Sequence, residues 1–132
     1  MGIDLHKDQH ILEAAYNDRA GVTAAFNRNI LSHLNTRFSC SFQPERFEHW
    51  AFYNTQAQQI EMHLRSTCNQ VVDLGSLEAH IELQNGETIR TEISRKFDLT
   101  TFSPLLADQG LPVQRTWLDE RSWFAVLLCQ AV

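Results

Sequence analysis

Residues 77–96 read LEAHIELQNGETIRTEISRK, and this stretch decides the fold. Apolar and polar residues alternate up to residue 83, which is the period of a half-buried strand. Asn85-Gly86 then predicts a type I′ turn, because both residues tolerate a positive φ. A return strand over residues 88–96 would complete a β-hairpin.

The register of this predicted hairpin gives Glu92 an unusual position. With a two-residue loop, Ala79 faces Glu92 and Leu77 faces Ser94, and directly opposed residues share one face of a sheet. A carboxylate on an otherwise apolar face is costly unless it is paired or serves a ligand. The alternative is a bulge, which would shift the register by one residue and turn Glu92 to solvent. The residues alone leave both interpretations open.

The flanking segments extend this hairpin into an α+β fold. Towards the N-terminus, residues 47–65 contain an aromatic-rich stretch and a cleanly alternating strand, so we expect antiparallel sheet structure over 47–97. Before it, apolar spacing predicts a short helix capped by Asp8 and a second helix over 19–35 capped by Asp18 or Asn17.

The C-terminal zone, residues 98–132, has a different pattern. Ser103 and Pro104 predict the start of a short helix, and Gly110 its C-terminal cap. Two strands follow, over 112–118 and 122–131. Since the last strand is nearly all apolar, we expect both of its faces to be covered.

Composition limits the class of protein. Eleven basic and sixteen acidic side chains give a net charge of −5, and the arginines are spread along the chain, so we expect no nucleic-acid partner. No apolar run approaches the length of a membrane span, and no signal peptide opens the chain, so we expect no membrane association and a cytoplasmic location. The three cysteines lack C-x-x-C spacing, which argues against a disulfide framework or a zinc site.

One cluster near the N-terminus has the residue types of a metal site. Its members are Asp4, His6, Asp8, His10 and Glu13. If Asp8 caps the first helix, His6 falls outside it, so we expect a solvated helix start and no metal. The sequence also lacks the G-x-S-x-G, P-loop and G-x-G-x-x-G motifs of nucleophilic and phosphate-binding sites.

Several stretches together resemble a known family along nearly the whole chain. They are GIDLHKD at 2–8, AAYNDRAGVTAAFN at 14–27, FEH at 47–49, IEMHL at 60–64, TEISRKF at 91–97 and WFAV at 123–126. They resemble the C-terminal part of the histidine-specific, S-adenosylmethionine-dependent methyltransferases. That family trimethylates the α-amine of histidine in ergothioneine biosynthesis.

The resemblance implies a fold and a division of the chain. The family combines a Rossmann-like methyltransferase domain with a substrate-binding domain that includes a long insertion. Residues 1–97 would be a late strand of the parallel sheet followed by the insertion, and residues 98–132 the closing helix and antiparallel strand pair of the methyltransferase domain. The family's glycine-rich turn and adenine-binding residues belong upstream. S-adenosylmethionine is therefore expected as the cofactor of the complete enzyme and not of this chain alone.

The resemblance also implies roles in binding the substrate. Glu92 matches a glutamate that accepts a hydrogen bond from the imidazole, and Ser94 matches a serine at the other ring nitrogen. Tyr16 matches a tyrosine that reaches the substrate carboxylate. The last two candidates are Met62, which would line the imidazole pocket, and Thr23, which would contact substrate through water. No catalytic, cofactor-binding or metal-binding residue is expected.

Three functions are compatible with this sequence. The first is the substrate-recognising portion of a histidine methyltransferase, inactive alone; the second is a free-standing binding or interaction module of the same family. The third is a methyltransferase acting on another amine, although a Glu–Ser pair suits an imidazole better than an indole. In each case the apolar last strand and the strand around residues 3–5 predict self-association, as a dimer.

Overall fold

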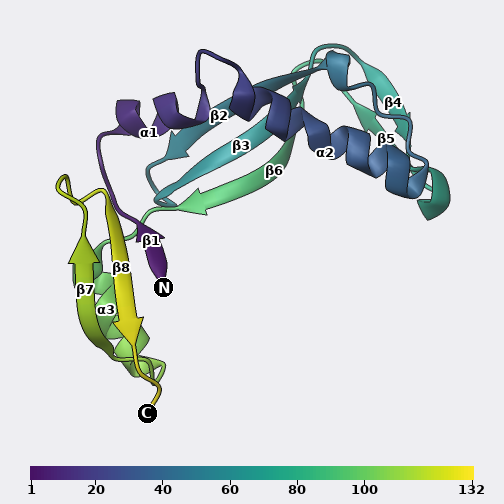
Figure 1. Ribbon diagram of the computed structural model, residues 1–132. Helices are drawn as coiled ribbons and strands as arrows, with labels where there is room; N and C mark the ends of the chain where they lie inside the picture. Colours follow the sequence, from purple (N-terminus) through teal and green to yellow (C-terminus); the bar gives the residue numbers. More distant parts are fainter. The chain divides into compact units, whose positions relative to one another are not determined.

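The computed structural model describes all residues from 1 to 132 and has mixed α+β structure (Figure 1). The chain forms two compact units, and each is discontinuous in sequence. The first comprises residues 1–12, 53–60 and 94–132, and the second comprises residues 13–52 and 61–93. None of the helices has both the length and the apolar character needed to span a bilayer.

The first unit is built on a three-stranded sheet. Its strands are β1 (Gly2–Asp4), β7 (Val113–Leu118) and β8 (Phe124–Cys129), in the order β1-β8-β7 with β8 antiparallel to both neighbours. Helix α3 (Leu99–Asp108) contributes Leu106 to a core shared with strand residues such as Leu127. The predicted C-terminal strand pair is confirmed.

Only one face of β8 is covered. Ala125 and Leu127 are buried, whereas Phe124, Val126 and Leu128 on the alternate positions are 44–53% exposed. The expectation that both faces would be covered is therefore wrong for this structure, because the core lies on one side of the sheet alone.

Helix α3 begins earlier than predicted. The Asp98 carboxylate accepts a hydrogen bond from the Thr100 amide at 2.7 Å, so the cap lies at Asp98 and not near Ser103. Pro104 lies inside the helix, where it removes one backbone donor. The end is as predicted, because Gly110 adopts a φ of +75° just after the last turn.

The second unit holds most of two sheets and a long helix. The three-stranded sheet has the order β2-β3-β6, with β2 (Phe47–Asn54), β3 (Gln59–Ser66) and β6 (Thr88–Arg95). The two-stranded sheet pairs β4 (Gln70–Asp73) with β5 (His80–Leu83). The remaining elements are α1 (Gln9–Tyr16), α2 (Val22–Phe38), η1 (Pro44–Arg46) and η2 (Gly75–Leu77).

Helix α2 provides one wall of the second unit's core. Its residue Leu31 packs with Phe47 of β2 and Leu64 of β3, and all three side chains are at most 1% exposed. In Figure 1, α2 runs alongside the sheet from β2 towards the β4-β5 pair. Strands β2 and β3 therefore pack directly against α2.

Both aspartates predicted as caps accept hydrogen bonds at the start of a helix, although the N-cap position of α2 is occupied by Gly21. The His10 amide donates to Asp8 at 2.8 Å at the start of α1, which leaves His6 outside the helix. Asp18 accepts from the backbone amides of Val22 and Thr23 at 2.9 and 2.8 Å. Helix α2 nevertheless begins at Val22 rather than at residue 19, because Asp18 reaches the helix across an intervening turn.

The hairpin predicted over residues 77–96 is wrong. Strand β5 pairs with β4, and β6 pairs with β3. Gly86 has a φ of +90° but Asn85 has no positive φ, which is the pattern of a type II rather than a type I′ turn. A type II turn does not match the twist of paired strands. Glu87 instead accepts from the Ser66 amide at 2.8 Å, so β6 starts alongside β3.

Candidate functional site

Glu92 borders a cavity in the second unit, although the predicted register that suggested this was wrong. The cavity has a volume of about 260 Å³ and lies between α2 and β6. Its lining residues are Phe26, Asn27, Asn29, Ile30, His33, Thr91 and Glu92. The site therefore offers an acceptor carboxylate beside the apolar walls of Phe26 and Ile30, which fits a flat ring that carries an N–H donor.

A buried amide lies beside this cavity. The Asn27 side chain is 3% exposed and points from α2 towards the sheet strands. Its Nδ2 donates to the main-chain carbonyl of His63 at 3.1 Å and lies 2.9 Å from Nδ1 of His49. Its Oδ1 accepts from the Thr91 hydroxyl at 2.6 Å. Asn27 thus connects α2 with β2, β3 and β6.

Tyr16 is connected to the same network through its main chain. Nε2 of His49 lies 2.9 Å from the Tyr16 carbonyl oxygen at the end of α1. The next residue, Asn17, donates from Nδ2 to the Ala51 carbonyl at 3.0 Å. The end of α1 is therefore tied to β2, and the half-buried Tyr16 side chain leaves from a fixed point.

Thr23 lies in the first turn of α2 and is engaged by Asp18. The hydrogen bonds from the Thr23 amide and hydroxyl, together with the Val22 amide, lower the pKa of Asp18 to about 2. The helix N-terminus is therefore already neutralised by an ionised carboxylate. Thr23 is half-buried at this position.

Met62 and Ser94 have different environments. Met62 is 2% exposed on β3, and its carbonyl oxygen lies 3.1 Å from the Thr91 hydroxyl. Ser94 belongs to the first unit, where its hydroxyl accepts from the Lys96 ammonium at 2.8 Å. Three of the predicted residues therefore lie at one hydrogen-bonded network of the second unit. The main-chain carbonyls of Tyr16 and Met62 belong to it, and Glu92 directly follows its member Thr91. Ser94 is not part of that network.

A second polar cluster in this unit contains a buried carboxylate. Glu61 is 7% exposed, and its Oε2 lies 3.3 Å from Nε2 of His63 and 3.7 Å from Arg90. The His63 ring stacks with Phe52 and is in contact with Trp50. Because Glu61 has both a histidine and an arginine as partners, we assign it a structural role in an ion pair and not a role in binding substrate.

The metal-like residues at the N-terminus have other roles. Asp4 forms ion pairs with Lys7 and Lys96, and Asp8 caps α1. His6 hydrogen-bonds through Nδ1 to the Tyr53 hydroxyl at 3.0 Å, and burial raises the pKa of Tyr53. No group of three or more histidine, cysteine or acidic side chains is arranged to hold a metal ion.

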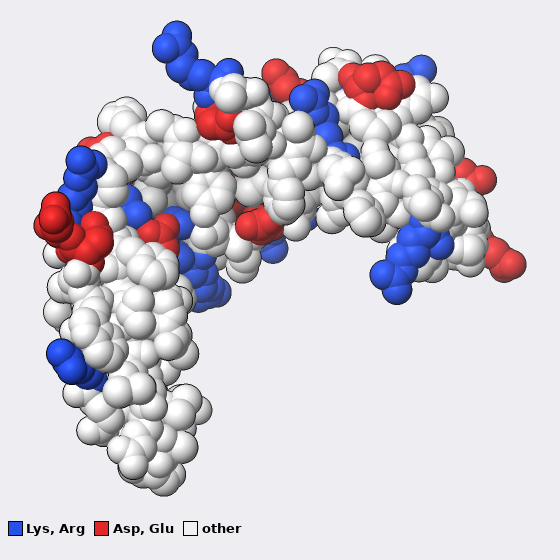
Figure 2. All heavy atoms as spheres, in the orientation of Figure 1, with Lys and Arg blue, Asp and Glu red and all other residues white.

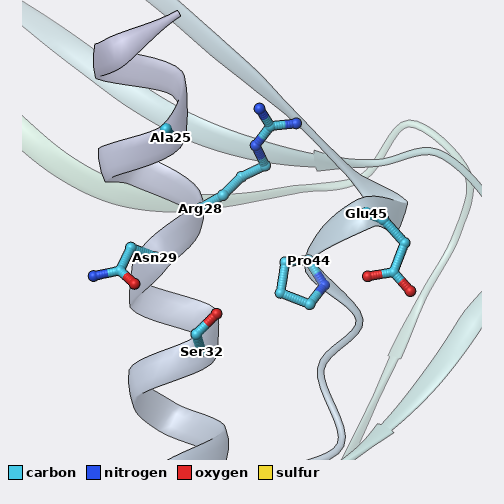
Figure 3. A pocket seen from close by; sticks show the side chains of 6 residues that line it. All are labelled: Ala25, Arg28, Asn29, Ser32, Pro44 and Glu45. Atoms are coloured by element: carbon cyan, nitrogen blue, oxygen red, sulfur yellow. The ribbon is translucent and has the colours of Figure 1, made fainter.

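Other depressions on the surface have a similar or larger volume, and Glu92 lines none of them. A depression of about 440 Å³ between α2 and η1 contains Arg28, Pro44 and Glu45 but none of the predicted residues (Figure 3). Basic and acidic side chains are interspersed on the face shown in Figure 2, without a continuous patch of either sign.

Sequence reasoning missed Asn27, His49 and Thr91. Asn27 lies four residues before Leu31 in α2, and these two are the buried residues of that helix. Because Asn27 lies on the same helix face as the apolar Leu31, the sequence indicates a buried polar residue that needs hydrogen-bond partners. Phe26 and Ile30, which the helical spacing had marked as apolar, are 66% and 41% exposed and face the cavity.

Comparisons with known proteins agree on one family. A family model described as histidine-specific, SAM-dependent methyltransferase matches residues 1–131. The histidine N-alpha-methyltransferase of Mycolicibacterium smegmatis is 40% identical over 128 residues, and that of Mycobacterium tuberculosis is 39% identical over 128 residues. Each alignment covers 97% of this chain and 40% of the relative.

The chain therefore spans about 40% of the length of these curated relatives. The match to the family model extends over nearly every residue, including those that line the cavity beside Glu92. The chain belongs to the family of histidine-specific, SAM-dependent methyltransferases.

Proposed function

We propose that this chain is the substrate-recognising portion of a methyltransferase that transfers methyl groups from S-adenosylmethionine to the α-amine of histidine, in ergothioneine biosynthesis. The observation that carries the proposal is the cavity between α2 and β6, where the Glu92 carboxylate lies beside Phe26 and Ile30. The names of the relatives, which act on histidine, support the same substrate.

The chain's own residues do not fit S-adenosylmethionine. A Rossmann-like cofactor site needs a glycine-rich turn between a parallel strand and a helix. The five glycines of this chain are Gly2, Gly21, Gly75, Gly86 and Gly110, and no two of them are close in sequence. The described parallel pairing is confined to the isolated bridge between Leu5 and Phe97. We infer that this chain has no methyltransferase activity alone.

Recognition of the imidazole is assigned to Glu92. A carboxylate accepts hydrogen bonds only, so it selects a ring that presents an N–H, and an isosteric apolar ring would leave it unpaired. Ser94, two positions further along β6, is proposed for the other ring nitrogen. Tyr16 and Thr23 are proposed for the carboxylate end of the substrate, and Met62 for the wall of the imidazole pocket, although none of the three lines the cavity beside Glu92.

Titration calorimetry of the chain with L-histidine tests this proposal. We expect binding that Glu92→Ala weakens by about 10- to 100-fold, the effect of losing a hydrogen bond to a charged group. Glu82→Ala is the matched control, since Glu82 is exposed on β5 of the same unit and lies outside the cavity. Equal affinities of Glu92→Ala and the parent, or no histidine binding by the parent, would contradict the recognition role.

A parallel titration with S-adenosylmethionine and its demethylated product addresses the cofactor. We expect no measurable binding of either. A micromolar affinity for one of them would contradict the inference that the cofactor site lies outside this chain.

We also propose that the chain forms a twofold dimer through the exposed face of β8. Phe124, Val126 and Leu128 form an apolar row, and the surface around β7 and β8 is largely uncharged in Figure 2. Exposed apolar faces of this kind favour association. Light scattering on a size-exclusion column should give twice 15.2 kDa at high concentration. Val126→Lys should shift the measured mass towards that of the monomer, whereas the control Glu120→Lys should not. A parent mass near 15.2 kDa at every concentration would exclude the dimer.

A further inference from the structure

We propose that Asn27 is the positioning residue of the recognition site, and that it acts through one directed chain of hydrogen bonds. The chain runs from Thr91 through Asn27 and His49 to the carbonyl of Tyr16. The positioning role rests on the proposed function of Tyr16 and Glu92, whereas the direction of the hydrogen bonds does not.

The orientation of the Asn27 amide follows from its neighbour on β3. The His63 carbonyl oxygen can only accept a hydrogen bond, so the Asn27 atom that lies 3.1 Å from it is the nitrogen Nδ2. The second hydrogen on Nδ2 points at Nδ1 of His49, 2.9 Å away. Nδ1 must therefore carry a lone pair and no proton.

The other end of the network requires the same form of His49. The Tyr16 carbonyl oxygen is also an acceptor only, so Nε2 of His49, 2.9 Å away, carries the proton. Two main-chain carbonyls on different elements thus independently specify the neutral Nε2–H tautomer. Oδ1 of Asn27 is left to accept from the Thr91 hydroxyl at 2.6 Å, the shorter of the two acceptor contacts of that hydroxyl, since the Met62 carbonyl oxygen lies 3.1 Å away.

This network links the two segments that carry the proposed substrate residues. Thr91 directly precedes Glu92 on β6, and the Tyr16 carbonyl fixes the end of α1 from which the tyrosine ring leaves. Because Asn27 is 3% exposed, removing any one partner would leave a buried polar group unpaired. All of these residues lie in the second unit, so the restraint acts within one compact body.

The ring of His49 provides a direct readout. Long-range ¹H–¹⁵N spectra of the labelled chain should show the Nε2–H tautomer. Asn27→Asp replaces the donor Nδ2 with a carboxylate oxygen opposite Nδ1, so the hydrogen bond that specifies the Nε2–H tautomer is lost and the His49 ring signals should shift. Asn85→Asp is the matched control, because Asn85 lies in an exposed turn outside the network. It should leave the His49 ring signals unchanged.

Thr91 tests whether the restraint reaches Tyr16. Thr91→Val removes the hydroxyl that donates to Oδ1 of Asn27 and should shift the amide signal of Asn17, which follows the Tyr16 carbonyl in sequence. Thr91→Ser keeps the hydroxyl and should restore the parent signal. In calorimetry, the Asn27→Asp and Thr91→Val variants should bind L-histidine about tenfold more weakly than the parent, because each loses one hydrogen bond of the network. The Thr91→Ser variant should bind L-histidine as tightly as the parent does.

The outcomes separate this inference from the proposed function. An Nδ1–H tautomer in the parent, or an unchanged Asn17 signal in Thr91→Val, would overturn the positioning role. Equal histidine affinity of the parent, Asn27→Asp and Thr91→Val would overturn it as well. If the parent binds no histidine, the proposed function is contradicted. The His49 ring signals and the Asn17 amide signal then test the hydrogen-bond network alone.

Discussion

The ammonium nitrogen of Lys96 lies 2.7 Å from a carboxylate oxygen of Asp4, and the Lys96 side chain is completely buried. Asp4 also pairs with Lys7 at 2.6 Å. Burial by itself would raise the pKa of Asp4, but the hydrogen bonds from Lys7 and Lys96 outweigh it and lower the pKa. The pair connects β1 with the end of β6 inside the first unit.

Asp4→Asn should destabilise the chain, because the buried Lys96 ammonium loses its anionic partner. Removing one member of a buried pair costs about 3 kcal/mol. Urea unfolding measures the loss, with Glu120→Gln as a control at an exposed site in the same unit. Equal stability of the two variants would show that the Lys96 charge is satisfied without Asp4.

Stability below pH 4 should depend on Asp18. The pKa of the Asp18 carboxyl is lowered from its ordinary value of 3.8 to about 2 in the folded chain, so the carboxylate stabilises the folded state fully above pH 3.8. That contribution is lost as the pH falls from 3.8 towards 2. Urea unfolding of the parent and Asp18→Ala should therefore give a constant difference from pH 7 to 5 that shrinks at pH 3 and vanishes near pH 2.

Asp108→Ala, at an exposed position in the last turn of α3, is the control for this experiment. It should show no such pH-dependent difference from the parent. A difference between parent and Asp18→Ala that persists unchanged at pH 2 would contradict the assignment of the cap to the ionised carboxylate.

Gly75 and Gly86 should differ in their tolerance of alanine. Both have a positive φ, but a Cβ at Gly75 would collide with the carbonyl oxygens of Phe38 and Ser39, whereas a Cβ at Gly86 would meet nothing within 4 Å. Gly86→Ala should cost about 1 kcal/mol, from backbone strain alone. Gly75→Ala should cost about 3 kcal/mol because overpacking adds to the strain. Thermal or urea unfolding compares them, and equal losses would argue against the crowding at Gly75.

Leu127 and Leu128 are neighbours on β8 with opposite environments. Leu127 is 1% exposed and Leu128 is 53% exposed. Leu127→Ala should cost about 2–5 kcal/mol, since it leaves a cavity in the core. Leu128→Ala should change stability by about 0.5 kcal/mol or less in dilute monomer. Similar losses for the two variants at low concentration would mean that the outer face of β8 is covered after all.

Local patterns predicted the elements of this fold better than their pairing. The caps at Asp8 and Asp18 and the C-terminal strand pair follow from residues that are close in sequence. The partner of β6 does not, because β5 and β3 offer similar alternating patterns and only the structure shows that β6 pairs with β3. Non-local pairing is decided by packing, which a pattern does not contain.

The candidate site shows the same division. Glu92 was singled out by a register that proved wrong, and by a family resemblance that remains its support. Asn27 and His49 carry no motif, and their connection spans 22 positions in sequence. Only the folded second unit brings the helix amide, the imidazole and the Thr91 hydroxyl within hydrogen-bonding distance.

The amide at position 27 also limits how this chain can vary. The site uses two N–H donors and one carbonyl oxygen from a single planar group. Among the common side chains, only glutamine carries the same set, and it is longer by one methylene. Single-nucleotide changes of an asparagine codon yield aspartate, histidine, isoleucine, lysine, serine, threonine or tyrosine, and none of these reproduces the set. Under selection for an intact site, every single-nucleotide change of this codon that alters the amino acid would therefore be removed.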